Sequence, residues 1–109
     1  MSSVAYIISK ENMSELIEDN ILAPIILGES GVKTVAFYFV GDGVYHLMKG
    51  NRNAKNIAAI IKKKQAEIYV CAISLKNRKL QNVVIENVKP GTMKDFFDAT
   101  ANVDHIISF

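Results

Sequence analysis

The chain has 109 residues, of which 50% are hydrophobic and 22% are charged, with only six glycines and two prolines. This composition excludes a disordered tail, a collagen-like repeat and a low-complexity linker. Thirteen basic against eleven acidic side chains leave a net charge of +2, which is too small to predict nucleic-acid binding. We therefore expect one domain over residues 1–109, with its own hydrophobic core.

A single cysteine, Cys71, excludes an intramolecular disulfide and a cysteine-rich zinc site. The longest apolar runs, 21–27 and 35–40, are far shorter than the roughly 20 residues that span a bilayer. The N-terminal residues lack the charged-then-apolar layout of a secretion signal. These features predict a cytoplasmic protein in a reducing compartment, with no membrane partner, metal or cofactor.

The first elements follow from apolar patterning. Residues 4–9 are almost continuously apolar, which is typical of a strand buried on both faces. Asn12 is suited to cap a following helix, and Pro24 should either kink that helix or begin a second one. The apolar stripe of this helix consists of Leu16, Ile17, Ile21 and Ile25. Gly28 and Gly31 are its expected stop signals.

The middle of the chain begins with the strongest strand signal, the β-branched and aromatic run 34–40. This strand ends at the glycine-rich turn 41–43, and a short helix is expected over 44–49. A second amphipathic helix follows, marked by Ala54, Ile57, Ala58 and Ile61. The lysines at 62–64 suit the negative end of its dipole and predict a solvated helix end.

The last part of the chain alternates in the same way. We expect a strand at 67–71, one or two helical turns at 72–78, a weaker strand at 83–88, a turn at 90–91, a helix over 93–100 capped by Thr92, and a final strand at 105–109. Such alternation predicts parallel strands joined by right-handed crossovers. The predicted fold class is thus α/β, a three-layer sandwich with a mostly parallel five-stranded sheet and helices on both faces.

In sheets of this kind, functional residues gather beyond the carboxyl ends of the strands. Three strand ends carry polar or reactive residues, at 9–11, 41–46 and 71–74. If their strands are neighbours, these segments meet at one edge of the sheet. The sequence therefore predicts a site at this edge.

Cys71 is the main candidate for chemistry at that edge. A free thiol with a pKa of about 8.5 is only about 3% ionised at pH 7, so a nucleophilic role needs assistance. The N-terminus of the following helix supplies some, and Lys76, Arg78 and Lys79 lie close behind in the sequence. The alternative is that Cys71 acts only as a small hydrophobic residue at the end of a core strand. The sequence pattern alone favours this alternative.

Other residues give weaker signals. Gly41, Asp42 and Gly43 can allow the backbone to approach an anion closely. The alternative is an ordinary turn in which Asp42 caps a helix, and this alternative is favoured because such turns are common. Their spacing matches neither phosphate-binding fingerprint. His46, beside the rim or on the outer face of its helix, and His105, in the last strand, form no metal pattern with Cys71.

Three segments resemble the DsrE/DsrF-like sulfur-relay family. Residues 40–50 look like the segment after that family's second strand, residues 67–78 like its active-cysteine segment, and residues 103–109 like its last strand. They occur in the family's order and cover nearly the whole chain. One departure is that Arg78 is followed by Lys79, where the family often has Arg-Gly, which leaves the subfamily open.

The resemblance implies an α/β subunit that forms a homo-oligomer or hetero-oligomer and carries sulfane sulfur as a persulfide on Cys71. Its partners would be a protein sulfur donor and a protein acceptor, without direct contact to nucleic acid. In this hypothesis Ser74 and nearby backbone N–H groups cradle the thiolate. The neighbouring wall is formed by Gly41, Asp42, Gly43 and Tyr45.

Two alternatives stay open. The first is a non-catalytic oligomeric subunit with a buried Cys71, which binds a partner or a small anion at the sheet rim. The second is a receiver-like phosphorylation module, which requires an acidic pair after the first strand. Residues 9–11 supply one acid, Glu11, and no pair, so the sequence disfavours that module.

Overall fold

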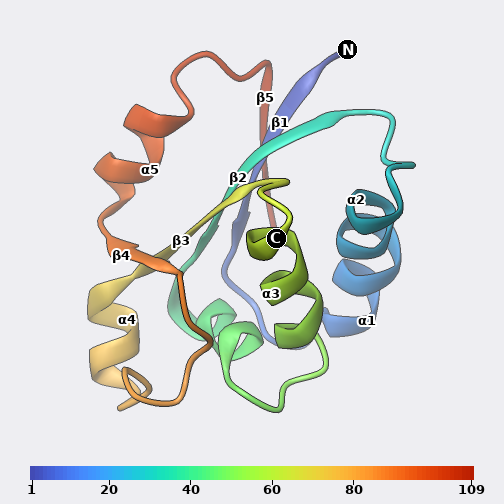
Figure 1. Cartoon of the computed structure of the whole chain (residues 1–109). Coiled ribbons are helices and arrows are strands. Elements are labelled where there is room, and N and C mark those ends of the chain that lie inside the picture. The colour runs from blue at the N-terminus through green and yellow to red at the C-terminus, as the bar shows by residue number, and fades with distance from the viewer.

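The computed structural model describes all residues, 1–109, and consists of five strands with helices on both sides (Figure 1). The strands are β1 (Ser3–Ile8), β2 (Lys33–Phe39), β3 (Glu67–Cys71), β4 (Lys89–Gly91) and β5 (His105–Ser108). The α-helices are α1 (Ser14–Ile17), α2 (Ala23–Leu27), α3 (Ala54–Lys62), α4 (Ala72–Asn77) and α5 (Met93–Ala99). A π-helical segment, η1 (Glu18–Leu22), joins α1 to α2, and a 3₁₀ segment, η2 (Gly41–Leu47), follows β2. No helix has the length and apolarity needed to cross a bilayer.

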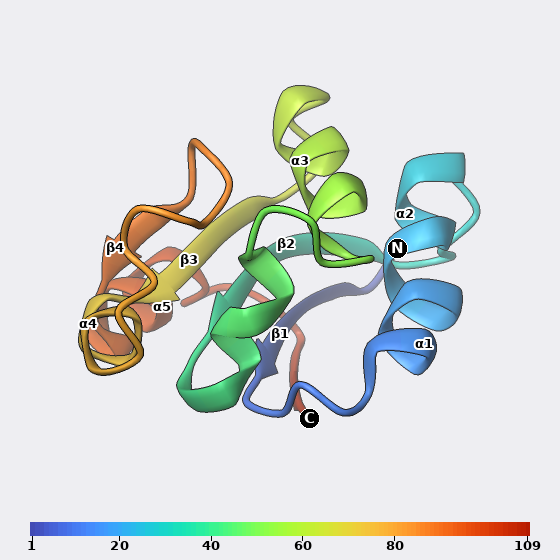
Figure 2. The ribbon, with the colours of Figure 1, turned by 90° about the horizontal axis from the view of Figure 1, so that it is seen from below.

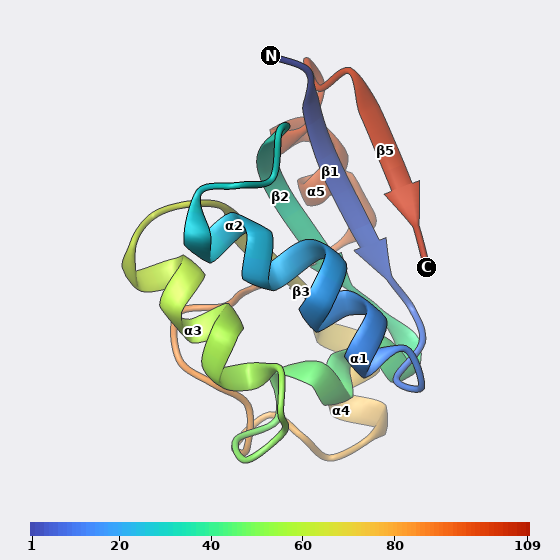
Figure 3. The same ribbon diagram turned by 90° about the vertical axis from the view of Figure 1, so that its right-hand side faces the viewer.

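All five strands run parallel, in the order β4-β3-β2-β1-β5, which confirms the α/β fold class. The chain first moves from β1 to β2 to β3, with its crossover helices α1, α2 and α3 on one face (Figures 2 and 3). It then returns across the sheet from β4 to β5 through α5 on the opposite face. Because such crossovers are right-handed, this reversal of direction requires the opposite face.

The two faces bury different amounts of apolar surface. The larger cluster contains 17 buried residues, among them Ile8, Phe37, Phe39 and Val70 from the strands. The smaller cluster contains Ala5, Ala36, Tyr38 and Phe96, and Phe96 from α5 stacks on Tyr38 with 5.5 Å between ring centroids. The face that α5 covers therefore buries far fewer apolar residues than the opposite face.

The expected strand at 83–88 and the expected turn at 90–91 were wrong. Val84 forms only an isolated antiparallel bridge to Met48, whereas Lys89–Gly91 pairs with Tyr69, Val70 and Cys71 as strand β4. Pro90 is compatible with this strand because β4 lies at the edge of the sheet, where the missing N–H breaks no ladder. Pairing with β3 thus makes a strand from residues that have little strand propensity.

Helix boundaries agree with the sequence in part. Asn12 does not cap the first helix, whose N-cap is Met13 without a side-chain hydrogen bond. Gly28 ends α2 in a left-handed conformation, with φ +72°, as expected. The helix after β2 begins at Gly41 rather than at residue 44. Thr92 does cap α5, and its hydroxyl forms a reciprocal capping box with Asp95.

Candidate functional site

The carboxyl ends of β1, β2 and β3 meet at one edge of the sheet (Figure 2). The backbone N–H of Gly41, after β2, donates to the hydroxyl of Ser74, after β3, at 2.9 Å. Gly43 packs directly on the end of β1, since a Cβ at this position would lie 2.0 Å from the carbonyl oxygen of Ile8. The segments that the sequence analysis placed at one edge are therefore in contact.

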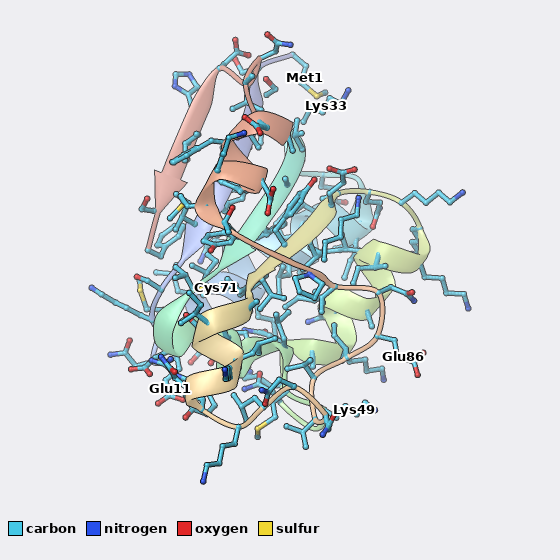
Figure 4. The ribbon with its side chains drawn as sticks, turned by 90° about the vertical axis from the view of Figure 1, so that its left-hand side faces the viewer. Met1, Glu11, Lys33, Lys49, Cys71 and Glu86 are labelled. Atoms are coloured by element: carbon cyan, nitrogen blue, oxygen red, sulfur yellow. The ribbon has the colours of Figure 1, made fainter.

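Cys71 lies at this edge, at the junction of β3 and α4 (Figure 4). Residues of β3 alternate between the two faces, so Ile68 and Val70 enter the larger cluster while Tyr69 and Cys71 pack against the smaller one. As the N-cap of α4, Cys71 accepts the backbone N–H of Ser74 on Sγ at 3.4 Å. Its side chain is half-buried, so part of it reaches the surface.

Burial and hydrogen bonding act in opposite directions on the thiol of Cys71. Partial burial raises its pKa, but hydrogen bonds from the hydroxyl and backbone N–H of Ser74, from the Tyr38 hydroxyl and from the Ile73 N–H lower it more. The net result is a pKa below the ordinary value of a cysteine thiol. A larger fraction of this thiol is therefore ionised at neutral pH than in a free cysteine.

Tyr38 belongs to the smaller cluster, against which Cys71 packs, and is 2% exposed. Burial, followed by its hydrogen bond with Cys71, raises the pKa of Tyr38 far above its ordinary value. Tyr38 therefore stays protonated and is available as a donor to the thiolate. Tyr38 carries no signal in the sequence, because only the pairing of β2 with β3 brings it beside Cys71.

Ser74 connects the thiol to the neighbouring loop. Its side chain is 7% exposed, and its hydroxyl acts on the sulfur of Cys71 while it accepts the Gly41 N–H. A hydroxyl offers one donor and two acceptor sites, so it can make both interactions at once. Ser74 thus couples the position of η2 to the environment of the thiol.

An ion pair closes the outer side of this arrangement. Arg78 donates from Nε and Nη2 to Oδ1 of Asp42, at 3.1 and 2.9 Å, and from Nη1 to the carbonyl oxygen of Ser74 at 3.2 Å. The carboxylate is 60% exposed, so the pair contributes little to stability. Its effect is to hold α4 against η2. Arg78 is thus directed toward Asp42, whereas the sequence suggested that it could act on the thiol.

Gly43 and Tyr45 lie outside this hydrogen-bonded group. The close approach of Gly43 to Ile8 explains the need for glycine there by packing alone. Tyr45 is half-buried and packs against the larger apolar cluster. Among the residues expected at the site, Cys71, Ser74, Gly41 and Asp42 are therefore linked by hydrogen bonds, directly or through Arg78, while these two support the adjacent loop.

His46 is fully buried, whereas the sequence suggested a position beside the rim or on an outer face. Its Nε2 donates to the carbonyl oxygen of Lys10 at 2.8 Å, and its Nδ1 lies 3.4 Å from the amide nitrogen of Asn53. Burial lowers the pKa of His46, more than the Lys10 carbonyl and Glu11 raise it. This neutral histidine joins the loop after β1 to η2 and to the start of α3.

The site contains no cluster of metal ligands, because nowhere do three His, Cys, Asp or Glu side chains gather. The largest surface hollow, of about 610 Å³, lies at the opposite end of the sheet, beside the amino ends of β2 and β3. We assign the chemistry to the edge with Cys71 because the hydrogen-bonded thiol lies there, whereas no cysteine lines the hollow.

Comparisons with known proteins identify the family and the fold. A model of the DsrE/DsrF-like family matches residues 3–109. Among solved structures, the ychN protein of E. coli superposes with a TM-score of 0.73 at 17% identity, over 100% of both chains. A conserved protein of unknown function from Bacteroides thetaiotaomicron gives a TM-score of 0.75 at 11% identity, over 99% of this chain and 95% of its own.

A protein of unknown function from Methanobacterium thermoautotrophicum is also similar, with a TM-score of 0.70 at 12% identity, over 98% of this chain and 99% of its own. At these identities the structures establish a shared fold. A search of curated proteins gave no match.

Proposed function

The chain belongs to the DsrE/DsrF-like family over residues 3–109, and on this premise we propose that it carries sulfane sulfur as a persulfide on Cys71. The family suggests a role in sulfur relay. The persulfide itself is our inference from the site. The observation that carries it is a half-buried thiol whose pKa is lowered by hydrogen-bond donors from α4 and β2.

Loading is a thiol exchange without net oxidation. The Cys71 thiolate attacks the terminal sulfur of a donor persulfide, the S–S bond of the donor breaks, and the donor leaves as a thiolate. The new S–S bond leaves Cys71 with the transferred sulfur and its proton. For release, a nucleophile on the acceptor attacks this outer sulfur, and Cys71 departs as a thiolate. One cysteine is sufficient for both steps.

The lowered pKa serves both steps. It increases the fraction of thiolate available for attack, and it makes Cys71 a better leaving group when the acceptor takes the sulfur. Hydrogen-bond donors that stabilise the Cys71 thiolate favour both steps, because this thiolate is the attacking group in loading and the leaving group in release. We assign this role to Ser74, to the backbone N–H groups after Cys71 and to the Tyr38 hydroxyl.

The surrounding wall is assigned to η2. Gly41 fixes the Ser74 hydroxyl through its N–H, and Asp42 holds Arg78 at the outer side of the site. Gly43 and Tyr45 act indirectly, by packing η2 against β1 and the larger cluster. The partners in this proposal are a protein sulfur donor and a protein acceptor, which need direct access to the exposed side of Cys71.

We further propose that the protein works in the cytoplasm, as a homo-oligomer. A free thiol persists in a reducing compartment. Self-association would cover apolar side chains that the single chain leaves exposed on the side of the smaller cluster, such as Phe97 at 46%.

The experiment that tests persulfide formation is intact mass spectrometry after incubation with inorganic polysulfide. The wild type should gain the mass of one sulfur atom, and a reductant should remove it. The Cys71→Ser variant should show no gain. If the wild type shows no gain either, or if the variant gains as much, the carrier role fails.

Native alkylation with iodoacetamide separates this role from a non-catalytic assembly subunit. A carrier requires that the reagent modifies Cys71 in the folded protein. Modification that occurs only after denaturation would indicate a thiol that partners cannot reach, and would favour the assembly subunit.

A further inference from the structure

A groove runs along helix α3, on the side facing the segment that leads from α4 to β4. Three adjoining hollows form it, with volumes of about 610, 570 and 430 Å³. The first and second share Ile61 and Asn87, and the second and third share Lys49, Ala58 and Ile85. We call these three hollows the basic groove. Figure 2 shows α3 and this segment on the same face of β3.

The charge of the molecule is concentrated along this groove. Its lining includes seven of the thirteen basic side chains of the chain but only two of the eleven acidic ones, Glu67 and Glu86. Glu67 is paired with Lys89. Five lining lysines take part in no ion pair: Lys33, Lys49, Lys55, Lys62 and Lys64. A chain with a small net charge thus has one strongly basic surface, which attracts an anionic partner.

The groove combines these charges with apolar surface. Ala58, Ile61 and Ile85 lie between the lysines, and the lining contains no aromatic residue. Surfaces that bind single-stranded nucleic acid offer aromatic rings on which bases stack. The aliphatic residues of the groove floor can instead contact aliphatic side chains of a peptide, while the lysines can pair with its carboxylates.

From these observations we propose that the basic groove binds an extended acidic segment of a partner protein, with carboxylates against the lysines and aliphatic side chains on the floor. The proposal does not depend on the chemistry of Cys71. It assigns a docking surface on the flank of the sheet that α3 covers, and none of its lining residues contacts the thiol. In Figure 4, Lys33 lies at one end of this flank, and Lys49 and Glu86 lie toward the other.

The test measures binding of a short fluorescein-labelled peptide in which Glu and Leu alternate, by fluorescence anisotropy. Wild type should bind it, and added salt should weaken the binding. The triple variant Lys49→Gln/Lys55→Gln/Lys62→Gln should bind about tenfold more weakly, because each exposed charge pair contributes modestly. All three lysines are exposed, so the variant should keep its fold, which circular dichroism checks.

A matched control removes three lysines elsewhere, as Lys10→Gln/Lys76→Gln/Lys79→Gln, which are also exposed. It should keep the affinity within about twofold, since screening weakens the action of distant charges. The proposal is overturned if the peptide does not bind, if both triple variants lose equal affinity, or if a single-stranded oligonucleotide of equal length binds more tightly than the peptide. A groove variant that changes the sedimenting mass would show instead that a second copy of this chain occupies the groove.

Discussion

At Cys71, the sequence supplies the thiol and the tertiary structure supplies the groups that act on it. Ser74 lies three residues further along α4, so its N–H and hydroxyl reach the sulfur through local geometry. Tyr38 comes from the neighbouring strand, and Gly41 fixes Ser74 from the next loop. The ionisation of one side chain therefore depends on three separate parts of the chain.

The Ser74→Ala variant tests this dependence. Loss of the hydroxyl removes a donor to the thiolate and leaves the Gly41 N–H without its acceptor, so the pKa of Cys71 should rise. Alkylation by iodoacetamide at neutral pH should slow several-fold, and its pH profile should move to higher pH. Ser14→Ala is the matched control, because that hydroxyl bonds only the Glu11 carbonyl. An unchanged profile in Ser74→Ala would contradict the assigned donor.

Gly43 illustrates a residue whose identity is set by packing. A Cβ there would lie 2.0 Å from the Ile8 oxygen and 2.6 Å from the Ile8 carbonyl carbon, and neither backbone atom can move freely. We expect Gly43→Ala to lower the free energy of unfolding by about 3 kcal/mol, measured by urea denaturation.

Gly50→Ala is the comparison, since its Cβ would meet nothing within 4 Å and the cost comes only from φ +92°. That cost should be about 1 kcal/mol. If both variants are equally destabilised, the close contact between η2 and β1 is not the reason for glycine at position 43.

At the scale of elements, apolar runs predicted β1, β2 and β3 because buried parallel strands need continuous apolar residues. They did not predict β4, since Lys89, Pro90 and Gly91 become a strand only through pairing with β3. The grouping of Cys71, Ser74 and Gly41 followed from the convergence of parallel strand ends. Tyr38, and the direction of Arg78 toward Asp42, could not be predicted, because both depend on strand register and on the fold of η2.

The buried His46 makes the stability of the folded chain depend on pH. Its pKa is lowered in the folded protein, so the folded chain binds fewer protons than the unfolded chain once the pH falls below the ordinary histidine value of about 6.5. Stability should therefore be complete above that pH, and should decrease as the pH falls toward the lowered pKa of the folded state.

Urea denaturation at about pH 7.5 and about pH 5.5 measures this decrease. In His46→Gln the difference between the two pH values should shrink, although the variant is less stable at both. A wild-type stability that rises on acidification over this range would contradict a neutral buried histidine.

At the scale of the molecule, the two faces of the sheet are covered unequally. Six helical segments, α1, η1, α2, η2, α3 and α4, contribute buried residues to one face, whereas α5 alone covers the other. Ile106 is in register with Ala5, so it shares the face of the smaller cluster, and it is 41% exposed. Phe97 of α5 is 46% exposed on the same side of the sheet. Two large apolar side chains are therefore exposed on this side of the sheet.

We expect the double variant Phe97→Glu/Ile106→Glu to weaken self-association, because it places charges in an apolar contact. Sedimentation velocity at micromolar concentration should show an oligomer for the wild type and a smaller species for the variant. Leu27→Glu is the control, since Leu27 is 67% exposed at the end of α2, in the other helical layer, and its replacement should leave the mass unchanged. A monomeric wild type would contradict assembly through this face.

The release of sulfur from Cys71 tests the central claim most directly. Protein loaded with polysulfide and then desalted is treated with cyanide, which takes sulfane sulfur from a persulfide as thiocyanate and leaves the thiolate. The account predicts one thiocyanate per loaded chain, with the protein mass returning to its unloaded value, and none from Cys71→Ser. The same yield from both proteins, or none from the wild type, would contradict a persulfide on Cys71.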